Sequence, residues 1–199
     1  FNIDTPSKSV MHFIKSSLLG DGTVCGKHGK NNRFCESHLT SVDYAKYVER
    51  ALGDCFVSHR VITSGFGSQI TQTLSKHFLA LDSLRSEWYK APGKTNLPDD
   101  ISWIDDFTVA KWYLDDGSLS HSDLQNDRAC FSTNGFSKEE VERLAAKLSE
   151  LYGVSVSVYE SRGWNIRVNY NNGTINNMWE KITPHIPQCF RYKVPEIFR

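Results

Sequence analysis

The sequence predicts an α+β fold built from two related halves. A similar sequence motif occurs twice, at 13–22 and at 107–117. Each copy is a mostly apolar segment with helical character that ends in Asp-Gly. The copies stand about half the chain apart, which indicates an internal repeat. Each is followed by the same order of predicted elements, so both halves have the order αββαββα. Hairpins placed between helices are typical of antiparallel sheets with helices packed on them, not of a parallel sheet.

The first half is predicted to span residues 1–96. Apolar residues at helical spacing predict a helix over 8–19, and we expect Gly22 to end it in the left-handed conformation. Turn-forming residues and alternating patterns divide the rest into four elements. These are a hairpin of 23–27 with 33–39, a helix capped by 40–41 and ending near 52, a hairpin of 56–62 with 69–73, and a helix over 74–89.

The second half is predicted to span residues 97–199 and repeats the plan. Ser137 and Glu140 form a capping-box pattern, which predicts a helix that runs from there to about 151. The strictest alternation of apolar and polar residues in the chain predicts a hairpin beyond this helix. The elements are a helix over 103–114, a hairpin of 117–121 with 129–133, the capped helix, a hairpin of 154–160 with 164–170, and a short helix over 171–182.

The balance of charge limits how the chain can bind nucleic acid. Lys and Arg together number 23, as do Asp and Glu, so the basic excess usual in DNA-binding proteins is missing. Basic and amide side chains gather in the predicted hairpins, whereas the predicted outer helices carry much of the acid. A basic sheet surface can therefore coexist with acidic outer surfaces on the helices in a chain of zero net charge.

The sequence predicts no membrane partner. No apolar run approaches the roughly 20 residues that a membrane span needs, and no signal-peptide pattern opens the chain. We expect an intracellular protein, with cytoplasm, nucleoid and organelle matrix all left open. Because the numbering opens at Phe1 and not at Met, we expect the chain to be part of a longer gene product.

The five cysteines are odd in number and form no Cys-x-x-Cys pair. We therefore expect reduced thiols and no disulfide framework. Cys25 with His28 and Cys35 with His38 have a zinc-like spacing. Residues three apart on a strand point to opposite faces, which spoils convergence on a metal, so buried or half-buried thiols are the favoured interpretation.

Both motifs and two shorter segments resemble the single-chain LAGLIDADG homing endonucleases. The second motif ends in Trp-Tyr-Leu-Asp-Asp-Gly at 112–117, a form common in that subgroup. The segments at 94–98 and 186–195 are similar to its linker and its closing segment. The resemblance covers nearly the whole chain. It implies a monomer with the two motif helices packed at a pseudo-two-fold axis and the sheets forming a saddle for double-stranded DNA, which is cut in both strands with a stagger at a long asymmetric site.

The resemblance places the last acidic residue of each motif, Asp21 and Asp116, in the active site. Carbonyl groups at a helix C-terminus, here including those of Gly20 and Asp115, also attract a cation. These oxygen ligands suit Mg²⁺; we expect Mn²⁺ to substitute and Ca²⁺ to bind without supporting cleavage. A lone Asp-Gly is more often a simple exit from a helix, and the duplication is what favours a site.

The resemblance also implies catalytic lysines and DNA contacts. Lys94 and Lys193 stand where this family places a lysine beside each scissile phosphate, to polarise the attacking water or stabilise the phosphate. A two-stranded ribbon fits the major groove, where Arg, Lys, Asn and Gln read base edges. The candidate contacts on the four hairpins are Lys27, His28, Lys30 and Arg33; His59, Arg60, Gln69 and Thr71; His121, Gln125, Asn126 and Arg128; and Arg162, Asn165, Arg167 and Asn169.

The motifs depart from the family pattern in two places. Ser16 and Ser17 replace glycine or aliphatic residues, and Lys111 and Trp112 stand within the second motif. Two alternatives to a free-standing nuclease remain. One is an intron maturase of the same fold with intron RNA as its partner, although retained acidic residues argue against an exclusively maturase role. The other is the endonuclease region of an intein, although the chain lacks the residues that splicing needs.

Overall fold

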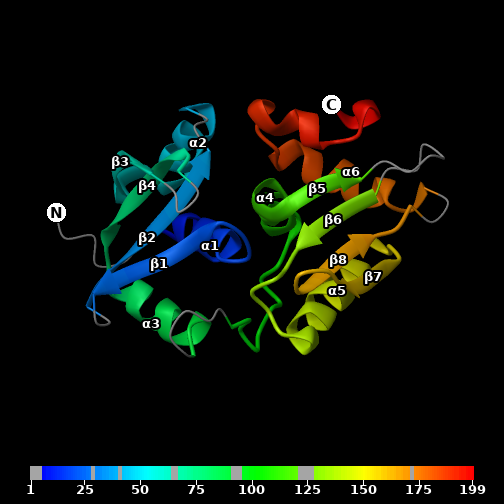
Figure 1. Cartoon of the computed structure of the whole chain (residues 1–199), viewed down its shortest axis with the longest axis horizontal. Coiled ribbons are helices and arrows are strands. Elements are labelled where there is room, and N and C mark those ends of the chain that lie inside the picture. The colour runs from blue at the N-terminus through cyan, green and yellow to red at the C-terminus, as the bar shows by residue number, and fades with distance from the viewer. Residues whose placement is uncertain are drawn as a thin grey trace. The chain divides into compact units, whose positions relative to one another are not determined.

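The computed structural model consists of two compact units, Phe1–Tyr89 and Lys90–Arg199 (Figure 1). Among the described residues, no helix is both long and apolar enough to cross a membrane. The structure describes residues 6–27, 30–39, 42–63, 67–90, 96–120, 128–170 and 173–199, with the backbone alone at 27, 30, 31 and 39.

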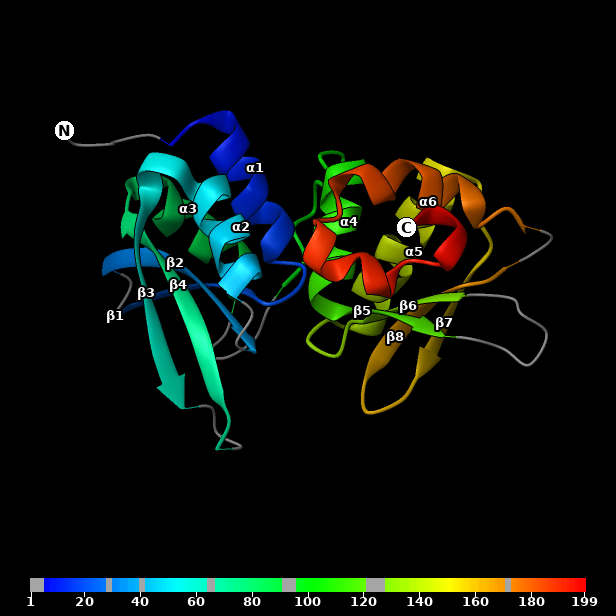
Figure 2. The same cartoon turned by 90° about the horizontal axis from the view of Figure 1, so that it is seen from above.

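The first unit is a four-stranded antiparallel sheet with helices on one face (Figure 2). The strand order β1-β2-β4-β3 makes each hairpin a pair of neighbours and joins the two hairpins through their inner strands. The opposite face of the sheet is left open. The elements are α1 (Lys8–Ser17), β1 (Gly22–Lys27), β2 (Lys30–Leu39), α2 (Val42–Leu52), a 3₁₀ turn (Gly53–Cys55), β3 (Phe56–Thr63), β4 (Gln69–His77) and α3 (Leu79–Trp88).

The second unit repeats this arrangement with strand order β5-β6-β8-β7, again antiparallel throughout. Its elements are α4 (Asp106–Asp116), β5 (Gly117–Ser120), β6 (Arg128–Ser132), α5 (Lys138–Tyr152), β7 (Val156–Glu160), β8 (Trp164–Val168), α6 (Asn176–Ile182) and 3₁₀ segments at Thr183–His185, Gln188–Lys193 and Glu196–Phe198. The α+β class and the repeated αββαββα order are confirmed.

Each unit packs its motif helix against an aromatic core. In the first, Phe13 of α1 meets Phe34 of β2 edge to face, with ring centroids 6.1 Å apart. In the second, Trp112 of α4 lies 4.4 Å from the ring of Phe131 on β6. Every residue of α4 from Thr108 to Leu114 is buried. A helix buried on all its faces is held by packing on each side, which fixes the direction in which its last residues point.

The capping box of α5 is confirmed. The Ser137 hydroxyl accepts from the Glu140 amide, and the Glu140 carboxylate accepts from the Ser137 amide. Gly153 ends the helix in the left-handed conformation, with φ of 66°. The second oxygen of Glu140 also accepts the amide of Leu97, at 2.7 Å, so this one carboxylate ties the start of α5 to the preceding segment.

The predicted start of the helix that follows the second hairpin is wrong. A helix over 74–89 was expected, whereas β4 continues to His77 and α3 begins at Leu79. Leu74 pairs with Cys35 on one side and Ser58 on the other, so both neighbouring strands extend the sheet past the predicted helix start. Pairing on two sides outweighs the weak helical periodicity of this short stretch.

Gly22 does not act as the predicted left-handed cap. The glycines with positive φ among the described residues are Gly53, Gly67, Gly153, Gly163 and Gly173. Gly22 is instead the first residue of β1, and a Cβ at this position would stand 2.6 Å from the Ser17 carbonyl oxygen. Glycine is therefore required here because there is no room for a side chain, and not because of the backbone conformation.

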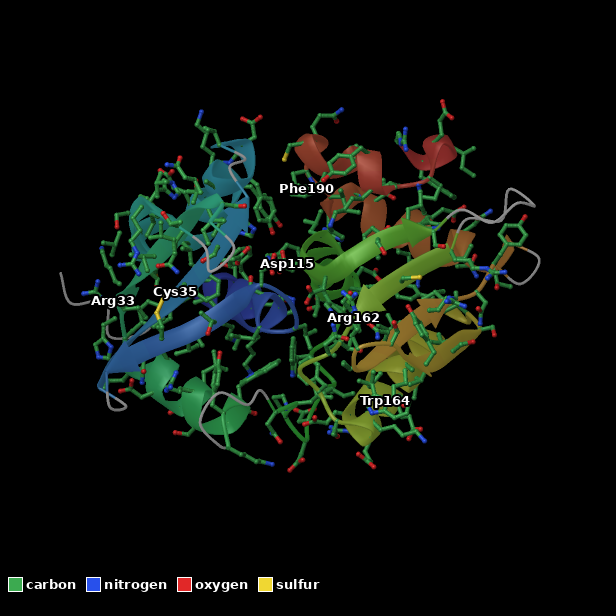
Figure 3. All side chains as sticks on the ribbon, in the orientation of Figure 1. Arg33, Cys35, Asp115, Arg162, Trp164 and Phe190 are labelled. Atoms are coloured by element: carbon green, nitrogen blue, oxygen red, sulfur yellow. A yellow bond between two sulfur atoms is a disulfide. The ribbon has the colours of Figure 1, made fainter. Side chains whose placement is uncertain are left out.

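The expectation of reduced thiols is wrong for one pair, because Cys25 and Cys35 are joined in a disulfide (Figure 3). The β1–β2 register pairs Cys25 with Arg33 and Thr23 with Cys35. The two cysteines are thus diagonal neighbours on one face of the hairpin, with Cα atoms 6.5 Å apart, a separation that a disulfide can span. Cys55, Cys130 and Cys189 are in no disulfide, as expected.

Candidate functional site

Asp21 follows the motif helix of the first unit at a tight turn. Beyond α1 the chain continues in 3₁₀-type bonds, in which the Leu19 amide donates to Ser16 and the Gly20 amide to Ser17. Asp21 is the last residue before β1, and its side chain is 43% exposed. The carboxylate is therefore fixed at the helix end and still open to solvent.

A polar cluster lies behind Asp21 on the helix-covered face of the sheet. Nδ1 of His38 stands 3.8 Å from Oδ2 of Asp21, and Nε2 of His38 stands 2.9 Å from Oε1 of Glu36. The latter contact is short but is not aligned as a hydrogen bond. The Tyr44 hydroxyl donates to the same Glu36 oxygen at 3.2 Å. Glu36 is fully buried and His38 almost so, which leaves the imidazole little freedom to turn.

The second unit presents Asp116 as the last residue of α4, with Asp115 beside it. Asp115 does not offer its side chain to a cation, because Oδ2 accepts from Nζ of Lys111 at 2.5 Å. Both side chains of this pair are fully buried. Of the expected metal ligands in this unit, the Asp116 carboxylate and the Asp115 carbonyl remain as candidates.

Lys193 lies at the C-terminal end of α4. Its ammonium donates to the carbonyls of Leu114 at 2.7 Å and Gly117 at 3.0 Å, which stand on either side of the Asp115–Asp116 pair. The Tyr113 hydroxyl donates to the Lys193 carbonyl at 2.8 Å. A cation at a helix C-terminus also interacts favourably with the helix dipole. The structure thus brings Lys193 to the end of the motif helix, whereas Lys94 lies outside the described residues.

The predicted Mg²⁺ ligands belong to two units, one carboxylate in each. Carboxylate and carbonyl oxygens fit a hard divalent cation, and the exposed Asp21 carboxylate has room for the waters that Mg²⁺ keeps. Across the described parts of the chain, no group of three or more His, Cys, Asp or Glu side chains is arranged to hold a metal.

The open face of the first sheet carries a polar ladder. Arg60 of β3 is paired with Gln72 of β4, and its Nε donates to the Gln72 side-chain oxygen at 2.7 Å. The Gln72 amide in turn donates to Ser37 of β2 at 3.0 Å. Arg33 is exposed on the same strand as Ser37 (Figure 3). The ladder includes predicted Arg60, and adds Gln72 and Ser37, which the sequence prediction missed.

His59 points to the other face. Its ring nitrogens stand 3.0 Å from the Thr73 hydroxyl and 2.9 Å from the Glu49 carboxylate of α2. Gln69 and Thr71 alternate onto the same face as Thr73. His59 therefore joins the sheet to its helix and does not belong to the polar ladder of the open face.

The open face of the second sheet carries Arg128, Arg167 and Asn169. Arg167 lies over the Tyr159 ring, 4.6 Å from its centroid, and the Asn169 amide donates to Ser157 at 2.8 Å. Asn165 has a different role, because its amide donates to the carbonyls of Ser161 and Gly163 and holds the β7–β8 turn. Exposed Arg162 lies in that turn with φ of 53° (Figure 3).

The remaining predicted contacts have no described side chains. Lys27 and Lys30 are described by their backbone alone. His28, His121, Gln125 and Asn126 lie outside the described residues.

The sequence pattern of the LAGLIDADG DNA endonuclease family matches residues 11–175. The chain belongs to this family. The matched segment contains both Asp-Gly motifs, and with them Asp21 and Asp116, whereas Lys193 lies beyond it. The LAGLIDADG resemblance drawn from the two motifs is therefore confirmed.

A solved structure and two protein sequences are similar to this LAGLIDADG chain over most of its length. The homing endonuclease I-WcaI, solved bound to its DNA recognition sequence, matches 96% of the chain and 88% of its own length with a TM-score of 0.81 and 21% identity, which shows the shared fold. An uncharacterized protein of Methanocaldococcus jannaschii is 25% identical over 98% of the chain and 76% of its own length. The cytochrome b mRNA maturase bI2 of Debaryomyces hansenii is 24% identical over 97% of the chain and 76% of its own length.

Proposed function

We propose that the chain is a site-specific DNA endonuclease that cuts both strands of a long asymmetric duplex with a stagger, by divalent-metal-dependent phosphodiester hydrolysis. The observation that carries this proposal is the equivalence of Asp21 and Asp116. Each carboxylate lies at the C-terminal end of the motif of its unit and directly precedes a glycine that opens the first strand. Membership of the LAGLIDADG DNA endonuclease family supports the reaction class.

The side chains at the two helix ends fit the hydrolysis of a phosphodiester. Divalent cations bound at Asp21 in one unit and at Asp116 in the other, Mg²⁺ by preference, would supply charge stabilisation and a water of lowered pKa. The chain's own residues position these groups: His38 contacts Asp21, and Lys111 pairs with the Asp115 side chain. Lys193, fixed at the end of α4, presents positive charge where the phosphate would gain negative charge.

The open face of each sheet is the proposed DNA surface. Arginine and amide side chains there can reach phosphates or base edges from a ribbon in the major groove. A structural neighbour, I-WcaI, was solved on its own DNA recognition sequence, which supports double-stranded DNA as the partner. We propose that the enzyme acts as a monomer, since residues 1–96 and 97–199 each carry one motif carboxylate. The described residues of these faces, together with Arg162 of the β7–β8 turn, are Arg33, Arg60, Gln72, Arg128, Arg167 and Asn169.

The second candidate function is RNA-binding maturation of an intron. The similarity to a cytochrome b mRNA maturase favours it. A maturase that does not cut DNA has no need for paired carboxylates at the motif-helix ends. Their retention makes the nuclease the first proposal, alone or combined with maturase activity.

The decisive experiment is a target-site selection followed by cleavage. A randomised duplex library is bound at low salt in Ca²⁺, and the bound fraction is then moved into Mg²⁺ or Mn²⁺, with Asp21→Asn and Asp116→Asn in parallel. We expect wild type to cut selected duplexes in Mg²⁺ and Mn²⁺ but not in Ca²⁺, and both variants to bind the same duplexes with cleavage reduced at least about 10³-fold. An intron-RNA binding assay runs beside it.

Three results separate the proposals. Selective binding with no cleavage under any metal or pH would refute the nuclease. Tight, selective RNA binding without DNA cleavage would support the maturase. Cleavage that survives both substitutions would show that the reaction uses other residues.

A further inference from the structure

The strand register aligns the two halves residue by residue next to their carboxylates. In the first unit Gly22, which follows Asp21, pairs with Glu36 on β2. In the second unit Gly117, which follows Asp116, pairs with Phe131 on β6. Two residues further along the chain stand His38, on β2, and Thr133, directly after the end of β6. Glu36 and His38 of one half therefore occupy the places of Phe131 and Thr133 in the other.

These equivalent positions have opposite chemistry. Phe131 packs against the rings of Trp112 and Tyr113, with centroids 4.4 and 5.5 Å apart. Thr133 is buried, and its hydroxyl donates to the Trp164 carbonyl at 2.6 Å, away from its motif. In the first unit the same places hold a buried carboxylate and an imidazole that reaches the motif's Asp21.

Burying a carboxylate is costly unless it is paired, and replacing such a pair with apolar residues is often neutral or stabilising. The second half shows that this fold accepts an aromatic residue at the place of Glu36. Stability alone therefore does not explain why Glu36, His38 and Tyr44 form a closed cluster at this place. What the cluster adds is a fixed imidazole: Tyr44 and Glu36 bound it on one side, and its Nδ1 faces Asp21 on the other.

We propose that His38, held by Glu36 and Tyr44, is a positioning residue for Asp21, and that the cleavage centre of the first half depends on it, whereas the equivalent places of the second half hold Phe131 and Thr133. This inference rests on the proposed function, because it assigns His38 to one of two centres. Side chains that orient a metal-ligating group typically contribute 10- to 100-fold to metal affinity or activity. Removal of His38 should therefore impair one strand cleavage and spare the other, which leaves a nicked duplex.

The test is strand-resolved, single-turnover cleavage of a selected duplex whose two strands carry different labels. His38→Ala should slow one strand about 10- to 100-fold and leave the other within a few-fold of wild type, so that nicked duplex accumulates. Glu36→Gln should slow the same strand, and His38→Gln, which keeps a side-chain amide near Asp21, should restore part of the rate. Thr133→Val removes a buried polar group at the equivalent place of the second half and should leave the ratio of the two strand rates unchanged.

A second measurement needs no catalysis. In the metal-free protein, the ¹⁵N chemical shifts of the His38 ring should change on Asp21→Asn and stay unchanged on Asp116→Asn. Binding of the duplex in Ca²⁺ should be the same for His38→Ala and wild type, which separates positioning from loss of fold.

The outcomes distinguish this inference from the function on which it rests. If wild type cuts neither strand, both the nuclease proposal and the positioning role of His38 are refuted. If wild type cuts both strands and His38→Ala slows both equally, or neither, the positioning role alone is refuted. The positioning role would also be refuted if the ¹⁵N chemical shifts of the His38 ring did not change on Asp21→Asn.

Discussion

Gly117 lies against Tyr113 at the end of α4, so closely that a Cβ on the glycine would stand 2.3 Å from the Tyr113 carbonyl oxygen. Gly22 stands in the corresponding relation to Ser17. The φ of Gly117 is −85°, which any residue can adopt, so glycine is needed here for space. Each strand can thus start directly after its motif, and each carboxylate is held between a helix end and a strand start.

Alanine at either motif glycine should destabilise the protein by at least about 2 kcal/mol, because the new methyl group meets backbone atoms that cannot move aside. Gly153 is a matched control, since its φ is 66° but nothing lies within 4 Å of its Cβ position. Gly153→Ala should cost about 1 kcal/mol, for the left-handed conformation alone. Urea unfolding of the three variants measures this; equal costs at Gly117 and Gly153 would contradict the close approach.

Lys111→Met should lower the free energy of unfolding by about 3 to 5 kcal/mol, because it leaves the buried Asp115 carboxylate without its cation. The double variant Lys111→Met with Asp115→Leu should recover most of that loss, since a buried ion pair can be replaced by apolar side chains at little cost. Thermal and urea unfolding of both variants test this. A double variant no more stable than Lys111→Met would mean that the carboxylate has other roles in the fold.

Lys193→Met should reduce cleavage at least about 100-fold, because the positive charge at the end of α4 is lost. It also removes two bonds to helix-end carbonyls, so stability should fall as well. Arg191→Met is the control, because Arg191 likewise donates to carbonyls, those of Ile186 and Phe198, in the same segment. Single-turnover rates should stay near wild type for Arg191→Met; an equal fall in both variants would assign the effect to packing of this segment.

Arg60→Ala and His59→Ala should affect different properties although the residues are adjacent: the first duplex binding, the second stability. Arg60 lies on the open face, so its loss should weaken duplex binding by about 1 to 3 kcal/mol. His59 bonds to α2, so its loss should lower stability by about 1 kcal/mol and leave duplex binding unchanged. Binding titrations in Ca²⁺ and urea unfolding separate the two. Weaker binding by His59→Ala alone would place DNA on the helix-covered face.

The order of elements could be predicted because each depends on neighbours in sequence. Hydrophobic spacing, the Ser137–Glu140 cap and the turn residues between strands are local signals. The start of α3 could not be predicted, because β2 and β3, both distant in sequence, decide how far β4 extends. The same reason explains the missed disulfide, which depends on the register between Thr23 and Cys35.

Candidate site residues could be named from the sequence where they lie within one motif, and not where they depend on strand pairing. Asp21 and Asp116 are marked by the repeated Asp-Gly, and Lys193 by a similar closing segment. His59 and Arg60 could not be assigned to faces, because the bulge between Phe56 and Ser58 shifts the alternation along β3. Glu36 gave no signal in the sequence, since only strand pairing places it opposite Gly22.

The bond between Lys193 and Leu114 also bears on synthesis of the chain. The two residues are 79 positions apart. At a translation rate of about 5 to 20 residues per second, the ribosome reaches the lysine roughly 4 to 16 seconds after the leucine. The turns of α4 can form in that interval, since their hydrogen bonds are local, but the ammonium that covers its last carbonyls does not yet exist. In the second half, α4 is therefore synthesised before Lys193. A nascent chain carries its Asp116 carboxylate before it has the lysine that binds the end of this helix.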